Sequence, residues 1–281
     1  MITAELQREI ERNVAAALAE DVGAGDCTAQ LLPAAQHSEA SIVCRSEAVV
    51  CGRPWAEHAL RTLDPELRIE WRATEGERVA PGTELCRLAG RTRALLTGER
   101  TALNFLQMLS AVATATRRYV DAIAGTRARI LDTRKTLPGL RLAQKYAVTV
   151  GGGTNHRKGL YDGILIKENH IAGAGSVTAA LERARAVAPA DVWIQIEVET
   201  HEQLEEALAA GATLVLLDNM TPEQMREAVR LTAGRAALEA SGGITLANVR
   251  AIAETGVDRI SIGALTKDVD AVDLSMRLRA K

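Results

Sequence analysis

Five basic side chains that could bind an anion follow short apolar runs of the sequence. They are Arg134 and Lys135 of "LDTRKT", His156 and Arg157 of "GGGTNHR", and Lys167 of "ILIKENH". Arg presents a fork of donors to a carboxylate or phosphate, and Lys acts as a point charge. Each cation alone would usually be solvated on a loop, but gathering all five is costly unless an anion compensates them. The pattern therefore predicts a site for a small polyanion.

Two glycine-rich stretches accompany these polar residues. The three glycines 151–153 allow the backbone to turn sharply or to approach a ligand closely. In "EASGGI", Ser241, Gly242 and Gly243 precede a helix that we expect to begin near Thr245. Backbone N–H groups and the N-terminus of a helix together bind phosphate. An S-G-G turn is common, but its place late in a series of strands and helices favours a phosphate site.

Two carboxylates also follow apolar runs. Strand alternation in "IQIEVET" puts Gln195, Glu197 and Glu199 on one face, and Glu199 has a commoner role as a capping or surface group. Asp218 ends the run "TLVLLD"; the alternative role, a helix N-cap, is better filled by Thr221. Paired carboxylates facing a phosphorylated ligand suit Mg²⁺, which completes its shell with water and substrate oxygens. We therefore expect Glu197 and Asp218 to hold Mg²⁺, partly through water.

The elements that must position these residues alternate regularly after residue 112. Six apolar runs end in polar residues: "ARILDTRKT", "DGILIKENH", "DVWIQIEVET", "TLVLLDNM", "AALEASGG" and "RISIGALT". Helical patterns such as "HEQLEEALAAG" lie between most of them. The alternation predicts a parallel sheet covered by helices, with ligands bound beyond the carboxyl ends of the strands. Six repeats fit an incomplete barrel; an open doubly wound sheet is the alternative, although no G-x-G-x-x-G motif supports it.

The first part of the chain has a different pattern of apolar runs and turns. An amphipathic helix from Thr3 to about Glu20 precedes several short apolar runs separated by turn signals, and then one long helix or two. This pattern predicts an α+β domain. We expect domain boundaries at 1–112 and 113–267, with the C-terminal segment 268–281 packed back onto the first domain.

Composition excludes several classes of protein. Aromatic residues make up 2% of the 281 residues and the formal net charge is −2, which argues against nucleic-acid binding. No apolar stretch approaches the roughly 20 residues of a membrane span. The four cysteines form no C-x-x-C pair and no signal-like start precedes them, so we expect reduced thiols in a cytoplasmic protein. No two histidines have the spacing of zinc ligands.

Together these motifs resemble the quinolinate phosphoribosyltransferase family, also called nicotinate-nucleotide pyrophosphorylase (carboxylating). The resemblance rests on the ordered blocks "TGERTALNFLQ", "LDTRKTLPGLRLAQKYAVTVGGGTNHRKGLYDGILIKENHI", "IEVE", "LLDNM", "EASGGI" and "ISIGALT", and covers nearly the whole chain. It implies an N-terminal α/β sandwich domain and an incomplete α/β barrel. It also implies Mg²⁺-dependent conversion of quinolinate and phosphoribosyl pyrophosphate to nicotinate mononucleotide, pyrophosphate and CO₂ in NAD biosynthesis.

The resemblance further implies roles for individual residues. Quinolinate carboxylates would contact Arg134, His156, Arg157, Lys167 and, from a neighbouring subunit, Arg100. Lys135 would lie between the two substrates, and Glu197 and Asp218 would bind ribose hydroxyls or Mg²⁺. The 5′-phosphate would contact Ser241, Gly242, Gly243 and Gly263. Many members carry a histidine where this chain has Lys267, which puts only that one phosphate contact in doubt. The family forms dimers in which one first domain closes the other barrel, and a hexamer is left open.

Four other functions stay open. The first is a molybdenum-transport-associated relative of the same fold, and the second is nicotinate phosphoribosyltransferase, which needs fewer cations for its monocarboxylate. The third is a Schiff-base aldolase built on Lys167. The fourth is an anion-binding protein without catalysis. The set of Arg100, Arg134, Arg157 and "KENH" favours the quinolinate enzyme.

Overall fold

The computed structural model describes residues 2–279, which form two compact units. The first unit contains residues 2–117, 137–152 and 268–279, and the second contains residues 118–136 and 153–267. The segment 137–152 thus clusters with the first unit, because its helix α4 (Arg141–Val150) packs on α1 (Ala4–Val22). The sequence pattern did not predict this assignment, because the segment lies between two of the apolar runs that we expected to form the barrel.

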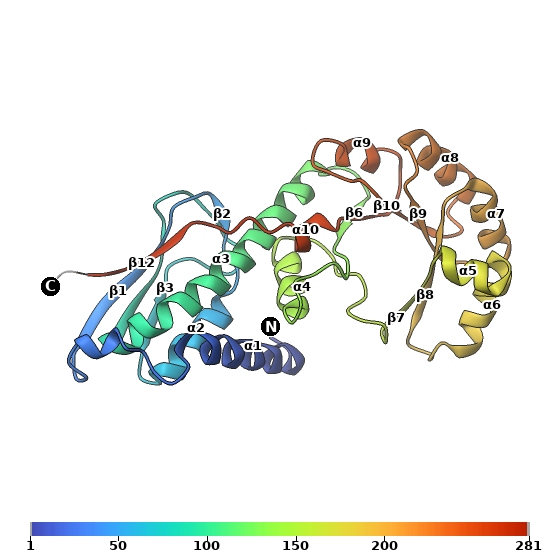
Figure 1. Cartoon of the computed structure of the whole chain (residues 1–281). Helices are drawn as coiled ribbons and strands as arrows, with labels where there is room; N and C mark the ends of the chain where they lie inside the picture. The colour runs from blue at the N-terminus through green and yellow to red at the C-terminus, as the bar shows by residue number, and fades with distance from the viewer. Residues whose placement is uncertain (1, 280–281) are drawn as a thin grey trace. The chain divides into compact units, whose positions relative to one another are not determined.

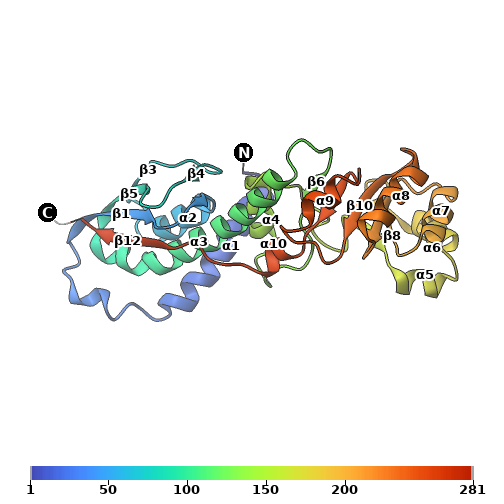
Figure 2. The same ribbon diagram turned by 90° about the horizontal axis from the view of Figure 1, so that it is seen from above.

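The first unit is built on an antiparallel sheet in the order β12–β1–β5–β3. The bounds of these strands are β12 (Leu274–Leu278), β1 (His37–Cys44), β5 (Glu84–Arg91) and β3 (Arg68–Trp71). Strands β2 (Ala48–Val49) and β4 (Arg78–Val79) form a separate pair. Figure 2 shows β12 (red) beside β1 (blue), so the end of the chain completes the sheet of the first unit.

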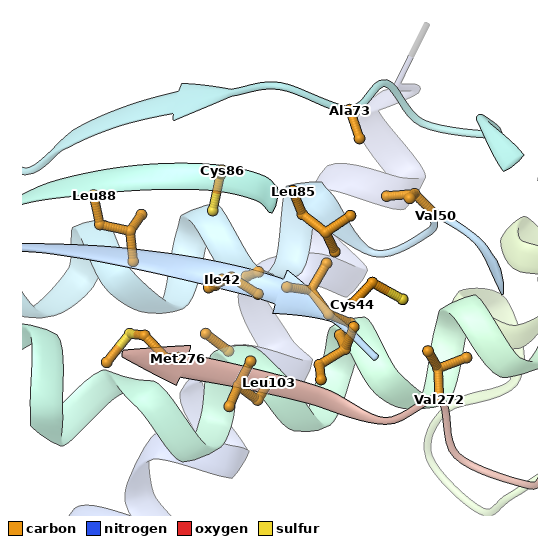
Figure 3. Close-up of a cluster of buried hydrophobic side chains, with 14 of the residues drawn as sticks. Ile42, Cys44, Val50, Ala73, Leu85, Cys86, Leu88, Leu103, Val272 and Met276 are labelled. Atoms are coloured by element: carbon orange, nitrogen blue, oxygen red, sulfur yellow. The ribbon is translucent and has the colours of Figure 1, made fainter. Parts of the chain in front are cut away.

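Helices cover one side of this sheet and close its core. They are α2 (Arg53–Leu63) and the 31-residue α3 (Thr92–Ala122), while α1 packs on α2 and the short 3-10 helix η1 (Ala29–Leu31) precedes β1. Thr3 begins α1 as its N-cap, because its side chain accepts a hydrogen bond from the backbone N–H of Leu6. Figure 3 shows aliphatic side chains of β1 and β5, such as Ile42 and Leu88, packed against Leu103 of α3 and Met276 of β12. With few aromatic residues, this core depends on interlocking aliphatic side chains.

The second unit is a parallel sheet of six strands in the order β6–β11–β10–β9–β8–β7. The strands are β6 (Arg129–Leu131), β7 (Gly163–Ile166), β8 (Trp193–Val198), β9 (Leu214–Asp218), β10 (Ala237–Ser241) and β11 (Arg259–Ser261). Figure 1 shows them curving inside a row of helices. These helices are α5 (Glu168–Ala174), α6 (Val177–Val187), α7 (His201–Ala209), α8 (Pro222–Thr232), α9 (Val249–Ala253) and α10 (Ala264–Lys267). All six predicted runs are strands, which confirms the expected α/β fold with parallel strands.

The sheet order shows where the barrel is incomplete. Strands β7 to β11 are neighbours in chain order, and β6 lies beside β11, so β6 and β7 form the two edges. The "GGGTNHR" segment pairs with the edge strand β6: Thr154 bridges Leu131 in parallel, and its N–H donates to the Ile130 carbonyl at 2.8 Å. An edge strand presents unpaired backbone groups. The segment satisfies part of this edge and brings His156 and Arg157 to it.

Two further features bear on the expectations from sequence. The helix expected near Thr245 begins only at Val249, because residues 245–248 form a turn in which the Asn248 side chain accepts from the Thr245 N–H. All four cysteines are unpaired. Among the helices described within residues 2–279, none combines the length and the apolar character that crossing a membrane requires.

Candidate active site

The strand register gathers the predicted polar residues at the carboxyl edge of the barrel sheet. Asp218 of β9 pairs with Ser241 of β10, and Glu197 of β8 pairs with Leu216, two residues before Asp218. Lys167 directly follows β7, and Gly263 lies two residues after β11. Since all six strands are parallel, their carboxyl ends share one edge. Residues that are distant in sequence therefore surround one region.

Lys167 and Glu197 form an ion pair across two adjacent strands, with Nζ 2.9 Å from Oε2. The Glu197 side chain is only 9% exposed, and this burial raises the pKa of its carboxyl. The charges of Asp218 and Glu168 raise it further, whereas the Lys167 hydrogen bond lowers it. Lys167 thus offsets part of the cost of burying the carboxylate. The effect of Asp218 on this pKa also shows that the two carboxylates are close.

Asp218 is positioned by its neighbour and not by a helix. The Asn219 amide donates to its Oδ2 at 2.7 Å, while Thr221 caps α8 through the N–H of Gln224. Asn219 has a φ of +55°, a left-handed conformation that Asn tolerates, and its N–H donates to the Ser241 carbonyl. The N-cap alternative for Asp218 is therefore wrong, and its carboxylate faces the shared edge.

Gly242 is required by this arrangement. A Cβ at Gly242 would lie 2.1 Å from the Asn219 Oδ1, and its φ of +99° suits only glycine. Gly243 also has a positive φ, of +59°, but a Cβ there would meet nothing within 4 Å. The turn thus presents backbone next to open space. Because α9 starts only at Val249 and is one short turn, the N–H groups beside this open space belong to a loop and not to the predicted helix N-terminus.

Two lysines lie on either side of Gly263. A Cβ there would come within 3.2 Å of Cδ of Lys135, which would have to shift slightly, and would lie in ordinary contact with Cε of Lys267 at 3.9 Å. Thr266 fixes the loop of Lys135, because its hydroxyl donates to the Lys135 carbonyl at 2.7 Å. Lys267, which stands where many members of the family carry a histidine, therefore lies against the same glycine as Lys135.

Arg157 and Arg134 supply positive charge on the side of β6. Arg157 is 8% exposed, and burial lowers the pKa of its guanidinium, with the nearby charge of Arg134 lowering it further. Its Nη1 donates to the Gly163 carbonyl at 2.9 Å. The charge of Asp162 acts in the opposite direction and raises this pKa, so Arg157 lies near one further cation and one carboxylate.

His156 makes three described hydrogen bonds within the protein, and its expected contact with a substrate remains a prediction. Its Nδ1 accepts from the Arg157 backbone N–H at 2.8 Å, and its Nε2 lies 3.0 Å from Oε1 of Gln195. Its own N–H donates to the buried Asp132 at 2.8 Å. Both ring nitrogens are therefore used within the protein. The sequence placed Gln195 on the Glu197 face, but it could not show this contact.

Arg100 belongs to the first unit. It lies on α3, where its side chain is exposed. Its predicted role depends on a second subunit and remains a prediction.

The two carboxylates fit a metal ion only in part. Glu197 and Asp218 each use one oxygen in a described contact, to Lys167 and Asn219, which leaves one oxygen on each for a ligand. Residues 2–279 contain no group of three or more His, Cys, Asp or Glu side chains that could hold a metal alone. Mg²⁺ tolerates such a site, since it commonly takes one or two carboxylates and completes its shell with water and phosphate oxygens.

The glycine turn generates a matched pair of substitutions. We expect Gly242→Ala to lower the free energy of unfolding clearly more than Gly243→Ala, because both strain a left-handed backbone by about 1–3 kcal/mol but only the former also displaces Asn219. Urea unfolding of both variants and the wild type measures the difference. Equal losses would show that Asn219 does not hold Asp218 through this turn.

Comparison with known proteins places this geometry in a family. The model of the C-terminal domain of quinolinate phosphoribosyl transferase matches residues 112–277, and that of the N-terminal domain matches residues 26–110. A probable nicotinate-nucleotide pyrophosphorylase (carboxylating) of Bacillus subtilis is 45% identical over 92% of this chain and 89% of its own length. The Mycobacterium leprae nicotinate-nucleotide pyrophosphorylase is 44% identical over 93% of this chain and 94% of its own.

A solved structure agrees with these relatives. The nicotinate-nucleotide pyrophosphorylase of Francisella tularensis superposes with a TM-score of 0.94 at 43% identity, covering 97% of each chain. The human nicotinic acid phosphoribosyltransferase has a TM-score of 0.67 at 16% identity, which shows a shared fold alone. On these matches the chain belongs to the quinolinate phosphoribosyltransferase family.

Proposed function

We propose that this chain transfers the phosphoribosyl group of phosphoribosyl pyrophosphate to quinolinate with decarboxylation, giving nicotinate mononucleotide, pyrophosphate and CO₂ for NAD biosynthesis. The observation that supports the proposal is the number of cations in the barrel: the charge of Arg134 acts on Arg157, Lys135 and Lys267 lie against Gly263, and Lys167 pairs with Glu197, whose pKa the nearby Asp218 raises. A dicarboxylate and a pyrophosphate ester are both polyanions. Only a strongly cationic lining holds two of them side by side.

The two substrates divide the lining between them. Arg134 and Arg157 suit the quinolinate carboxylates, because guanidinium groups bind carboxylates through two parallel hydrogen bonds. Lys135 and Lys267, which meet at Gly263, suit phosphate oxygens together with the N–H groups near Ser241, Gly242 and Gly243. Lys167 is held by Glu197 and can reach either substrate. We assign His156 to positioning, because its ring nitrogens are occupied.

The reaction follows from this arrangement. The ring nitrogen of quinolinate attacks C1 of the ribose as the bond to pyrophosphate breaks, and positive charge develops on the sugar. Glu197 and Asp218 steady that charge and bind the ribose hydroxyls. The ribosylated ring is cationic, so it accepts the electron pair left at C2 when the adjacent carboxylate departs as CO₂. A proton then binds at C2 to give the product, and positioning supplies most of the rate.

Mg²⁺ is part of the proposal. Glu197 and Asp218 would hold it through their remaining oxygens and water, and it would neutralise charge on the departing pyrophosphate. The chain's own contribution is to hold both carboxylates in place through the hydrogen bonds from Lys167 and Asn219. Chelation with EDTA should abolish turnover, and restoring Mg²⁺ should recover it.

Competing functions differ in what they predict. The family models and the named relatives favour the quinolinate enzyme over the molybdenum-transport-associated relative. Nicotinate phosphoribosyltransferase would need one carboxylate site, whereas two arginines lie together here. In a Schiff-base aldolase Lys167 must be a free amine, but its ammonium is paired with Glu197. We also infer a cytoplasmic location, which fractionation of cells would test.

One incubation tests the reaction. The protein is mixed with phosphoribosyl pyrophosphate, Mg²⁺ and either quinolinate or nicotinate, and CO₂ and nicotinate mononucleotide are measured. We expect product and CO₂ in the quinolinate tube only. Product from nicotinate alone would mean that a monocarboxylate is the substrate. Absence of product in both tubes would contradict the proposed reaction.

The arginines generate a second prediction. Arg134→Ala should raise the half-saturating concentration of quinolinate by at least about tenfold and that of phosphoribosyl pyrophosphate by about twofold or less, because it removes a carboxylate fork. Arg230→Ala, on the exposed face of α8, serves as the control. Equal weakening of both substrates would refute this division of the lining.

Arg100 generates a third prediction, which tests the proposed homodimer. If Arg100 acts on the barrel of a partner subunit, Arg100→Ala and Lys135→Ala proteins should each be inactive alone. Mixing and refolding them together should restore about a quarter of the wild-type activity, since about half the dimers would be mixed and each would hold one intact site. No recovery would contradict an active site shared between subunits. Sedimentation of the wild type would separate a dimer from a hexamer.

A further inference from the structure

We propose that Gln195 and Glu239 are positioning residues of the quinolinate site, which act through His156 to hold Arg157 toward a substrate carboxylate. The inference rests on the proposed function for the identity of the ligand. Neither residue was among the candidates from sequence, and neither lies at the carboxyl edge of the sheet. Both are fully buried, at 0% exposure, inside the barrel.

The residues form one continuous chain of hydrogen bonds. Nε2 of His156 lies 3.0 Å from Oε1 of Gln195, and the Gln195 amide donates to Oε2 of Glu239 at 3.1 Å. Glu239 is in turn bound by the Ser261 hydroxyl and by Nε of Arg259, at 3.1 Å from Oε2. The chain thus connects the segment beside β6 to strands β8, β10 and β11. It crosses most of the barrel interior without an unsatisfied member.

The direction of every hydrogen bond in this chain is determined. The Arg157 backbone N–H can only donate, so Nδ1 of His156 must be unprotonated. Nε2 then carries the proton and donates to Gln195, which orients the Gln195 amide group toward Glu239. Glu239 accepts as a carboxylate. Any other tautomer of His156 would set two donors or two acceptors against each other.

Arg157 depends on the same segment. Its backbone is fixed by the Nδ1 contact, and its guanidinium is fixed by the Gly163 carbonyl through Nη1 alone. Among the described residues, no carboxylate lies within ion-pair distance of this guanidinium, although it is 8% exposed. It borders a cavity of about 790 Å³ that Trp193 lines together with Asp162, Asp258 and the first residues of β6, β9 and β11. The charge of Asp162 acts on the guanidinium. The remaining N–H donors are available to an anion in this cavity, provided that His156 holds the backbone in place.

The ring of His156 is also confined by packing. It meets Trp193 edge-on, with 5.1 Å between the ring centroids. A buried ring that touches one aromatic face and has two satisfied nitrogens has little freedom to turn toward a ligand. This explains why a histidine, and not a third arginine, precedes Arg157. The His156 ring contacts Gln195 in the barrel interior and also fixes the backbone N–H of Arg157.

A substitution that interrupts this series of hydrogen bonds tests the positioning role of Gln195. Gln195→Leu keeps the size of the side chain but leaves the His156 Nε2–H and the Glu239 carboxylate without this partner. We expect the half-saturating concentration of quinolinate to rise at least about tenfold, with that of phosphoribosyl pyrophosphate changed about twofold or less. Gln203→Leu, which removes one glutamine contact on α7 of the same unit, should change neither.

A spectroscopic measurement keeps the test valid if the variant folds poorly. In the wild type, ¹⁵N NMR of labelled histidine should show His156 with Nδ1 unprotonated and Nε2 protonated, its signals assigned by their loss in His156→Ala. A charged ring or the opposite tautomer would overturn the inference, whatever the activity.

The outcomes separate this inference from the proposed function. A wild-type protein that makes no product from quinolinate contradicts the function, while the NMR result still tests the hydrogen-bond chain. An active wild type with a Gln195→Leu variant of unchanged quinolinate dependence overturns the inference alone. Equal weakening of both substrates would mean that Gln195 only stabilises the barrel, which also overturns it.

Discussion

The repulsion between Arg134 and Arg157 in the barrel unit is the constraint on which the site depends. Burial and the neighbouring Arg134 both lower the pKa of Arg157, so the folded protein holds this cation at a cost. The charge of Asp162 offsets part of that cost. Glu197 is paired with Lys167 and Glu239 with Arg259. We propose that an anion bound from outside offsets the rest.

The incomplete barrel makes this arrangement possible. In a closed barrel, β6 and β7 would pair with each other, and no loop could lie between them. Here residues around Thr154 satisfy part of the edge of β6 and carry His156 and Arg157 into the interior. The glycines before them let the backbone make this approach. Gly151, for example, lies so close to Ala113 and Thr116 that a Cβ would come within 2.6 Å of both.

Much of this was predictable from the sequence, because strands alternate and parallel strands end at one edge. The two-residue period that identified Glu197 also contained Gln195, and Glu239 and Ser261 likewise lie two residues before Ser241 and Gly263. In the sequence, the buried series of hydrogen bonds was indicated by polar residues at strand positions that face inward. The sequence could not show that they contact one another, since that depends on how three strands and one loop converge.

Other features depend on packing between distant segments. Helix α4 reads as part of the barrel in sequence order, but its buried face packs against α1 in the first unit. The late start of α9 depends on a single side chain, Asn248, which binds both the Thr245 N–H and the Gly243 carbonyl. The expectation that His156 binds substrate followed from its residue type and neighbours. Its saturation by Arg157 and Gln195 became visible only in three dimensions.

The central claim is that the paired arginines form a site for two carboxylates on one ring. Equilibrium titration calorimetry of the wild-type protein with pyridine-2,3-dicarboxylate, and separately with the 2- and 3-monocarboxylates, measures this directly. We predict that the dicarboxylate binds at least about tenfold more tightly than either monocarboxylate, because each carboxylate gains its own charge-assisted hydrogen bonds. Equal affinity for all three compounds would contradict the claim.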